Sequence, residues 1–212
     1  GKKLYYDAYG NMTRIDEFSP NHYDITWYGY DGNKNLTGIA DALGNERYFT
    51  YDLLGRRITA EDLHAKNDTT FGKYSFTYDA AGNVLTVTDP ENTRRTFVYD
   101  ALGRITSDDS TLTPNVEAIY TYDWCGAWGK GRLCSVNAQG VITNYTYDTR
   151  GRIVQESRTI PGSSVAYTTI TTYDIQNNPV TITYPNSAMV FYKYNNIGKV
   201  ESVQLQASAS AA

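Results

Sequence analysis

Cysteine, histidine and methionine are scarce in this sequence, which contains two of each among 212 residues. Two cysteines with no histidine nearby fall short of the four ligands that a structural zinc site needs. His22 and His64 lie in polar stretches without any nucleophile motif, so we expect both on the surface and no catalytic residue. The sequence therefore predicts a protein without a metal site, a cofactor or an enzymatic activity.

Long apolar runs and clusters of basic residues are also missing. No stretch approaches the ~20 apolar residues of a membrane span, and the N-terminal GKKLYYD has no apolar signal-peptide core. The formal net charge is −4, whereas nucleic-acid binding depends on clustered Lys and Arg that neutralise phosphates. We therefore expect no membrane span and no nucleic-acid partner, and any export signal would lie outside this chain.

Aliphatic residues are few, whereas tyrosine is abundant. Leu, Ile, Val and Phe account for 42 of the 212 residues, and the chain has 20 Tyr and 3 Trp. So low an aliphatic share borders on disorder only when the net charge is high, which is not the case here. Tyr and Trp suit a pleated, half-buried surface, because the ring packs while its polar edge stays hydrated. The composition favours an aromatic β-structure.

A Tyr-Asp or Tyr-Asn pair recurs nine times, and in most copies a glycine and a strand-like run follow it. Neighbouring copies are 21 to 27 residues apart, a period that indicates one structural unit stacked on copies of itself. We interpret residues 1–206 as one continuous array of about nine repeats, and residues 207–212 as a disordered tail. The first residues of these pairs, called the key tyrosines below, are Tyr6, Tyr30, Tyr51, Tyr78, Tyr99, Tyr122, Tyr147, Tyr173 and Tyr194.

Two turn signals about ten residues apart divide each repeat into two short strands. In the first, an aspartate after the key tyrosine can accept backbone hydrogen bonds, and a glycine can take a positive φ. Lys34 and Asn177 stand near the glycine position, and Asn195 replaces the aspartate, so we expect altered turns there. The pattern predicts an all-β fold of antiparallel strand pairs. The turn residues with a predicted structural role are Asp52, Gly55, Asp79, Gly82, Asp100, Gly103, Asp148 and Gly151.

A second aromatic residue stands two places before most key tyrosines, as Phe97 does before Tyr99. A spacing of two puts both rings on one face of a strand. Because the repeats stack, we expect the rings of neighbouring repeats to pack against one another in an aromatic ladder. At roughly 0.5–1.5 kcal/mol for each ring pair, such a ladder would rival the net stability of a whole domain.

The motif Tyr-Asp-x-x-Gly-Arg followed by Ile or Val, with a second turn about ten residues later, resembles the RHS or YD-repeat family over essentially the whole chain. Related repeats occur in bacterial Rhs proteins, the C components of insecticidal toxin complexes and animal teneurins. The resemblance implies a long β-sheet that spirals into a hollow shell, which in toxin members encloses a C-terminal toxic domain. It also implies a secreted or cell-surface location and a cargo or toxin domain of the same polypeptide as partner.

The repeat that begins at Tyr122 departs most from the pattern, because its turn swells into DWCGAWGKGRLC. Cys125 and Cys134 lie across a predicted hairpin, so they form either a disulfide or two unpaired thiols. Trp124 and Trp128 either stack on sugar rings or fill gaps between strands. Sugar stacking would make the array an adhesive or carbohydrate-binding surface module, which is the alternative to the shell.

The ends of such a sheet lead to one more expectation. The first and last strands of a repeat array expose unpaired backbone amides and carbonyls unless they are capped or paired. We therefore expect the chain to self-associate through its sheet edges.

Overall fold

The computed structural model describes residues 1–20 and 22–207, and in that part of the chain it contains 19 β-strands and no helix. The all-β class expected from the repeat pattern is confirmed. The predicted tail lies outside the described residues, apart from Ala207. The chain divides into two compact units, which are Gly1–Arg104 with Asp109–Pro114, and Ile105–Asp108 with Asn115–Ala212.

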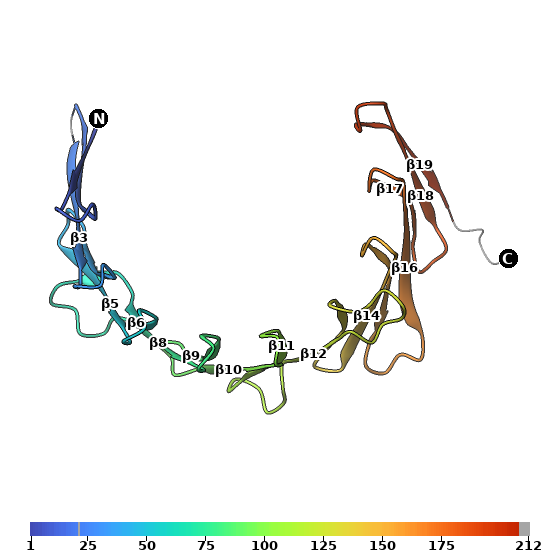
Figure 1. Ribbon diagram of the computed structural model, residues 1–212, viewed down its shortest axis with the longest axis horizontal. Helices are drawn as coiled ribbons and strands as arrows, with labels where there is room; N and C mark the ends of the chain where they lie inside the picture. The colour runs from blue at the N-terminus through green and yellow to red at the C-terminus, as the bar shows by residue number, and fades with distance from the viewer. Residues whose placement is uncertain (21, 208–212) are drawn as a thin grey trace. The chain divides into compact units, whose positions relative to one another are not determined.

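The first unit is a meander in which nearly every strand pairs antiparallel with its neighbour along the chain (Figure 1). The exception is the long connection after β6, which adds the two-residue strand β7 beside β5 and leaves β8 to pair with β6. Its strands are β1 (Lys2–Tyr6), β2 (Met12–Ser19), β3 (His22–Tyr30), β4 (Leu36–Ala40), β5 (Asn45–Tyr51), β6 (Arg57–Glu61), β7 (His64–Ala65), β8 (Lys73–Tyr78), β9 (Val84–Thr88) and β10 (Arg94–Tyr99).

The second unit continues the same meander without an exception, and each strand again pairs antiparallel with the next one. Strand β11 begins in this unit, and its last two residues belong to the first. The strands are β11 (Ile105–Ser110), β12 (Ala118–Tyr122), β13 (Leu133–Ala138), β14 (Val141–Tyr147), β15 (Ile153–Thr159), β16 (Ala166–Tyr173), β17 (Pro179–Thr183), β18 (Met189–Tyr194) and β19 (Val200–Gln206).

A β-bulge recurs at the key tyrosines. Between Thr50 and Tyr51 the pairing shifts by one residue, so that Thr50 lies opposite Thr59 while Tyr51 lies opposite Arg57. The same shift precedes seven other key tyrosines. A bulge places two residues opposite one and increases the local right-handed twist of the strand pair. Each repeat therefore carries one built-in bend beside its Tyr-Asp turn.

The sheet is a single layer in each unit, so most side chains are half-buried rather than fully buried. Among the described residues, the buried apolar side chains are those of Phe49, Ala60, Ala118 and Cys134. The aromatic residue before each key tyrosine lies on the same side of its strand. Phe76 and Tyr78, for example, are half-buried, whereas Thr77 between them is exposed.

The opposite face of the sheet carries cross-strand pairs of hydroxyl groups. Thr77 and Thr86 face each other with their Oγ1 atoms 2.7 Å apart, and Thr121 and Ser135 do the same at 2.7 Å in the second unit. The two faces of the ribbon therefore differ in chemistry, since one is aromatic and the other is lined with neutral hydroxyls.

Candidate functional site

The feature that recurs along both units is the junction between neighbouring repeats. It is built from three parts, namely the Tyr-Asp turn, the key tyrosine and the residue four places after the turn aspartate. The sequence pointed to the first two, and each is described below from its contacts.

One aspartate closes the entire Tyr-Asp turn, as the turn from Asp148 to Arg152 shows. The Asp148 amide donates to the Arg152 carbonyl at 3.0 Å, and the Gly151 amide donates to the Asp148 carbonyl at 2.9 Å. The Asp148 Oδ1 accepts the amides of Arg150 and Arg152 at 2.9 and 3.0 Å, and its Oδ2 accepts Arg152 Nε at 2.7 Å. Gly151 has a φ of 79°, a conformation that glycine adopts without a steric penalty. The carboxylate satisfies both amides that the turn leaves unpaired.

The irregular copies make the same turn with other residues. Lys34 and Asn177 take the glycine position with φ values of 67° and 71°. The Asn195 Oδ1 accepts the amides of Ile197 and Lys199 at 3.1 and 3.0 Å, as an aspartate would. These substitutions are tolerated because a side-chain amide oxygen still accepts hydrogen bonds and because asparagine visits the left-handed region readily. They preserve the turn and therefore the repeat.

The turn carboxylates are held in their ionised form. The hydrogen bond from the Arg152 side chain, followed by the backbone amides, lowers the pKa of Asp148 although partial desolvation opposes this. The backbone amide and the side chain of Arg104 lower the pKa of Asp100 in the same way. Hydrogen bonds to the charged form stabilise it. At neutral pH these groups act as fixed hydrogen-bond acceptors rather than as proton donors.

Each key tyrosine after the first ties its repeat to the preceding one. The Tyr99 hydroxyl donates to the Val84 carbonyl at 2.8 Å, and Val84 is the residue that lies opposite Tyr78, the previous key tyrosine. The same bond, between 2.6 and 2.9 Å long, is made by Tyr30, Tyr51, Tyr78, Tyr122, Tyr147, Tyr173 and Tyr194. The key tyrosines therefore form a chain of hydroxyl-to-backbone bonds from repeat to repeat.

The expected ladder of stacked rings is wrong. Within the units, the ring pairs found among the described residues are Phe18 with Tyr23 and His64 with Phe71, and neither contains a key tyrosine. The physical reason is the strand count, since two-stranded repeats place the strands of consecutive key tyrosines about 9–10 Å apart. Aromatic pairs interact at centroid distances of about 4.5–7 Å. The phenol hydroxyl bridges to the intervening strand instead.

Arginine at the fifth position of the turn joins one turn to the next. Arg56 is held by its own Asp52 at 2.7 Å and donates to the Asp79 carbonyl of the next turn at 2.7 Å. Its guanidinium also lies over the ring of Tyr78, 4.8 Å from the centroid, where a cation–π contact forms. In the second unit Arg152 makes the equivalent contacts with Asp174 and Tyr173. The recurring Gly-Arg pair was the sequence signal for this role, which the motif reading did not use.

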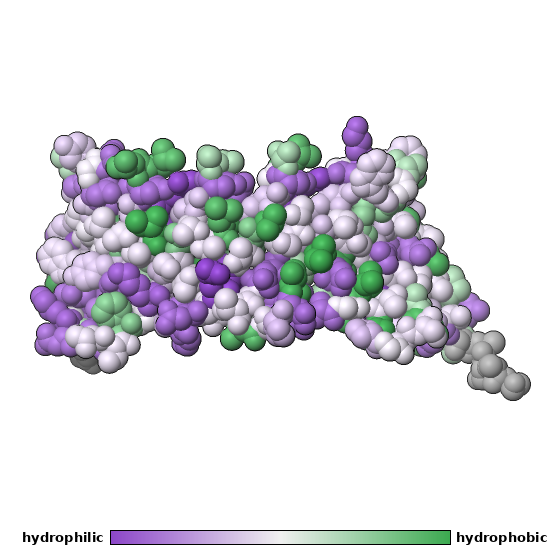
Figure 2. Space-filling view, turned by 90° about the horizontal axis from the view of Figure 1, so that it is seen from below, coloured by the Kyte–Doolittle hydropathy of each residue, from purple (hydrophilic) through white to green (hydrophobic). Residues whose placement is uncertain are grey.

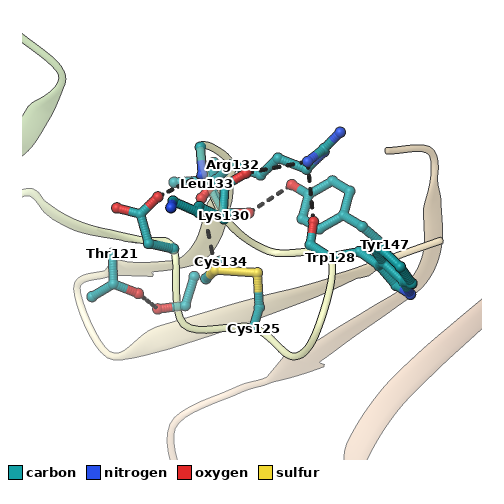
Figure 3. The surroundings of a disulfide bond; sticks show 11 residues. Thr121, Cys125, Trp128, Lys130, Arg132, Leu133, Cys134 and Tyr147 are labelled. Carbon is teal, nitrogen blue, oxygen red and sulfur yellow. Dashed lines mark hydrogen bonds between the residues drawn. A yellow bond between two sulfur atoms is a disulfide. The ribbon is translucent and has the colours of Figure 1, made fainter. Parts of the chain in front are cut away.

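The swollen loop keeps the ends of the turn and replaces its interior (Figure 3). Cys125 and Cys134 are joined by a disulfide. The Asp123 amide still donates to the Arg132 carbonyl at 3.0 Å. Arg132 donates to the carbonyls of Trp128 and Lys130 at 3.1 and 3.2 Å, and lies 5.6 Å from the ring centroid of Tyr147. The disulfide therefore braces an enlarged turn that remains in phase with the others.

The two tryptophans of this loop differ in exposure. Trp124 is 93% exposed and Trp128 is 50% exposed. Figure 3 shows Trp128 on the side of the loop that carries Tyr147, away from the disulfide. Trp124 is therefore not a gap filler between strands, and its indole is available to a partner.

One of the two histidines is not where we expected it. His22 is exposed and pairs with Asp24 at 2.6 Å, whereas the His64 side chain is only 7% exposed and stacks on Phe71 at 3.9 Å between centroids. Phe71 and β7 belong to the long connection between β6 and β8, which folds back on β5 and encloses the imidazole. A surface position for His64 is therefore wrong.

Two other properties concern binding to metals and membranes. Among residues 1–20 and 22–207, no group of three or more His, Cys, Asp or Glu side chains is placed to hold a metal ion. In the same part of the chain, no helix has the length and apolarity needed to cross a bilayer.

Comparison with known proteins places these repeats. The family model described as RHS Repeat matches residues 30–62 and 75–112, and the model described as Teneurin YD-shell matches residues 116–209. Comparison with curated protein sequences finds no match.

Three solved structures share the fold. The structure titled TcdB2-TccC3-Cdc42 aligns with 96% of this chain at a TM-score of 0.78 and 16% identity, and the alignment covers 12% of that chain. TcdB2-TccC3 without its hypervariable C-terminal region aligns over 95% of this chain and 12% of its own, at 0.77 and 18%. A Photorhabdus luminescens Tc holotoxin pore aligns over 97% of this chain and 14% of its own, at 0.69 and 14%.

This chain thus spans about an eighth of the length of these structural relatives. At identities below a fifth, the alignments establish the fold and not the activity. Together with the two family models, the bulged Tyr-Asp turns and the tyrosine-to-carbonyl bonds identify the chain as a member of the RHS/YD-repeat family.

Proposed function

We propose that this chain is a length of the wall of a secreted β-sheet shell, which encloses a C-terminal cargo or toxin domain of the same polypeptide. The role is structural, and no residue of the wall takes part in a chemical reaction. The chain of tyrosine-to-carbonyl bonds carries this proposal, because it connects eight consecutive junctions without a break in kind.

The physical logic concerns a single-layered sheet that has no second layer to stabilise it. Neighbouring strands in such a sheet are held by backbone hydrogen bonds that water competes for, so a wall needs extra links between repeats. The key tyrosines and the turn arginines supply those links at one edge of every repeat. A wall built in this way separates two spaces without needing any enclosed core of its own.

The structural relatives support the same role. One of them carries, by its title, a hypervariable C-terminal region, and variable content behind a constant wall is what a container needs. The low aliphatic content of the present chain also fits, since a single-layered wall buries little apolar surface. The shell spiral itself belongs to this proposal.

Protease protection in the natural polypeptide that carries this chain tests the proposal. An epitope at the C-terminus should survive digestion in the intact polypeptide, and the C-terminal region expressed alone should be degraded. The triple variant Tyr99→Phe, Tyr147→Phe, Tyr173→Phe should shorten the survival time, because it removes three links between repeats. Tyr6→Phe is the matched control, since Tyr6 is 57% exposed and lies in the first strand. Equal digestion rates with and without the repeats would contradict an enclosing wall.

A second candidate function is adhesion through glycan binding, and the exposure of Trp124 favours it. An indole that projects from a disulfide-braced loop can stack on a sugar ring. A glycan screen of the chain should then detect saturable binding that Trp124→Ala or Trp128→Ala abolishes. Trp27→Ala is the control, because the guanidinium of Arg14 lies 4.7 Å from the Trp27 ring and occupies one of its faces. Absence of binding by the unmodified chain would leave the wall as the function.

A further inference from the structure

The tips of the Tyr-Asp turns carry large apolar side chains that point into solvent. Leu53 is fully exposed, and Leu102 and Ile175 are 75% and 82% exposed. Tyr9, Leu54 and Ile197 have similar exposure at equivalent tips. Figure 2 shows separate hydrophobic groups that project along one rim above a band of hydrophilic residues. We call this rim the tip rim.

The turn itself does not require apolar residues at its tip. Asn33 and Arg150 occupy the place that Leu54 and Leu102 hold in their turns, and these turns close with the same hydrogen bonds. Turn tips are ordinarily polar, and an exposed row of apolar groups indicates an interaction surface. The leucines and isoleucines of the tip rim therefore need an explanation outside their own turns.

The opposite rim of the second unit contains an apolar hollow. It has a volume of about 610 Å³ and lies between the β15–β16 connection and the β17–β18 turn. Its walls are formed by Val165, Tyr167, Tyr184, Pro185 and Ala188, with Asn186 at the border. The Tyr167 and Tyr184 rings are both nearly half exposed, so the hollow is open to an incoming side chain.

We propose that the tip rim of one length of this repeat sheet docks on the opposite rim of another length of the same repeats, with an apolar tip side chain seated in the hollow. Spacing supports this occupant. Successive tips and successive hollows are both one repeat, or two strands, apart, which is about 9–10 Å. Two rims of the same sheet are therefore commensurate, and one contact sets the register for the next.

The length of the relatives supports the same occupant. Their chains are about eight times as long as the aligned part, so further lengths of sheet are available to dock. The contact joins different surfaces of the two copies and is heterologous, which produces rows rather than closed pairs. It does not depend on any cargo, so its failure would leave the container proposal untouched.

Cross-linking between two single-cysteine variants tests the contact directly. The two native cysteines are consumed by the disulfide and no free thiol remains. Chains with Ile175→Cys and chains with Asn186→Cys, mixed under mild oxidation, should give a disulfide-linked heterodimer. The control replaces Ile175→Cys with Val98→Cys, whose side chain is 51% exposed in the middle of β10. Equal cross-linking by this control would overturn the proposal.

Sedimentation across concentration gives the second readout. The triple variant Leu53→Ser, Leu54→Ser, Leu102→Ser should associate at least tenfold more weakly than the unmodified chain, while Val98→Ser should not. Circular dichroism verifies that each variant folds. Association that survives the triple variant would assign it to the unpaired edges of β1 and β19. A monomer that forms no cross-link and binds soluble saccharides in the hollow would assign the hollow to glycans. Either result overturns the proposal.

Discussion

The regular turn from Asp148 to Arg152 and the enlarged loop from Asp123 to Arg132 connect strands in the same unit and follow equivalent key tyrosines. Both close with an aspartate amide that donates to an arginine carbonyl at 3.0 Å. Inside the regular turn, one carboxylate satisfies the amides. Inside the enlarged loop, a disulfide and the Arg132 contacts with backbone carbonyls hold the chain. The ends of the connection are constrained by the repeat, and its interior is free to vary.

The comparison also shows which contacts the array needs. Tyr147 bonds to the Leu133 carbonyl just after the enlarged loop, and Tyr173 bonds to the Ile153 carbonyl just after the regular turn. An arginine lies over each of these rings. An insertion of five residues therefore leaves the link to the next repeat intact, because the link is made by the strand ends rather than by the loop.

Removing the disulfide should have the largest effect. Cys125→Ser with Cys134→Ser should lower the stability of the second unit by about 2–3 kcal/mol, the chain-entropy cost of opening a loop of this length. Urea unfolding followed by tyrosine and tryptophan fluorescence measures the change. A reducing agent should lower the urea midpoint of the unmodified chain and leave that of the double variant unchanged. The disulfide would prove dispensable if the two oxidised proteins unfolded at the same midpoint.

Alanine at the turn glycines should distinguish the two connections next. Gly151→Ala should cost at least about 1–2 kcal/mol for the left-handed conformation, and more because an added Cβ would collide with the Arg132 side chain. Gly126→Ala in the enlarged loop, with φ of 92° and no atom near its Cβ position, should cost the strain alone. Thermal unfolding of both variants gives the comparison. A larger loss for Gly126→Ala would contradict a role for Arg132 against the next turn.

Loss of one tyrosine hydroxyl should have a smaller effect. Tyr173→Phe removes the 2.9 Å bond to the Ile153 carbonyl and should cost about 0.5–1.5 kcal/mol. Tyr147→Phe should cost a similar amount if the enlarged loop leaves its junction intact. Tyr6→Phe is the control and should change nothing, since its exposed ring lies in the first strand. Hydrogen exchange of the amides in β15 and β16 locates the effect, and unchanged exchange there would exclude a linking role.

The pH dependence of the turn carboxylate should be the smallest effect. Because the pKa of Asp148 is lower in the folded chain than its ordinary value of 3.8, its contribution is complete above that value. It is lost as the pH falls through the folded-state pKa. Asp148→Asn should therefore be less stable than the unmodified chain at pH 7, and the difference should shrink at pH 2–3. A difference that does not vary with pH would mean that the carboxylate charge is unimportant, as the natural Asn195 turn would then suggest.

Much of this architecture follows from short stretches of sequence. The Tyr-Asp-x-x-Gly-Arg pattern places turns and strands correctly, because an aspartate and a glycine act on their own backbone within five residues. The same local logic explains why Asn195, Lys34 and Asn177 preserve their turns. Alternation of aromatic and polar residues likewise places Phe76 and Tyr78 on one face of β8.

Tertiary structure alone decided who contacts whom between repeats. The hydroxyl acceptors are backbone carbonyls, which Met12, Arg57 and Pro179 supply equally well, so no side-chain pattern could announce them. The spacing of two strands ruled out ring stacking, and a fold-back of the long connection buried His64. Local conformation depends on a residue and its near neighbours, whereas these contacts depend on distances across the sheet, which exist only once the strands have paired.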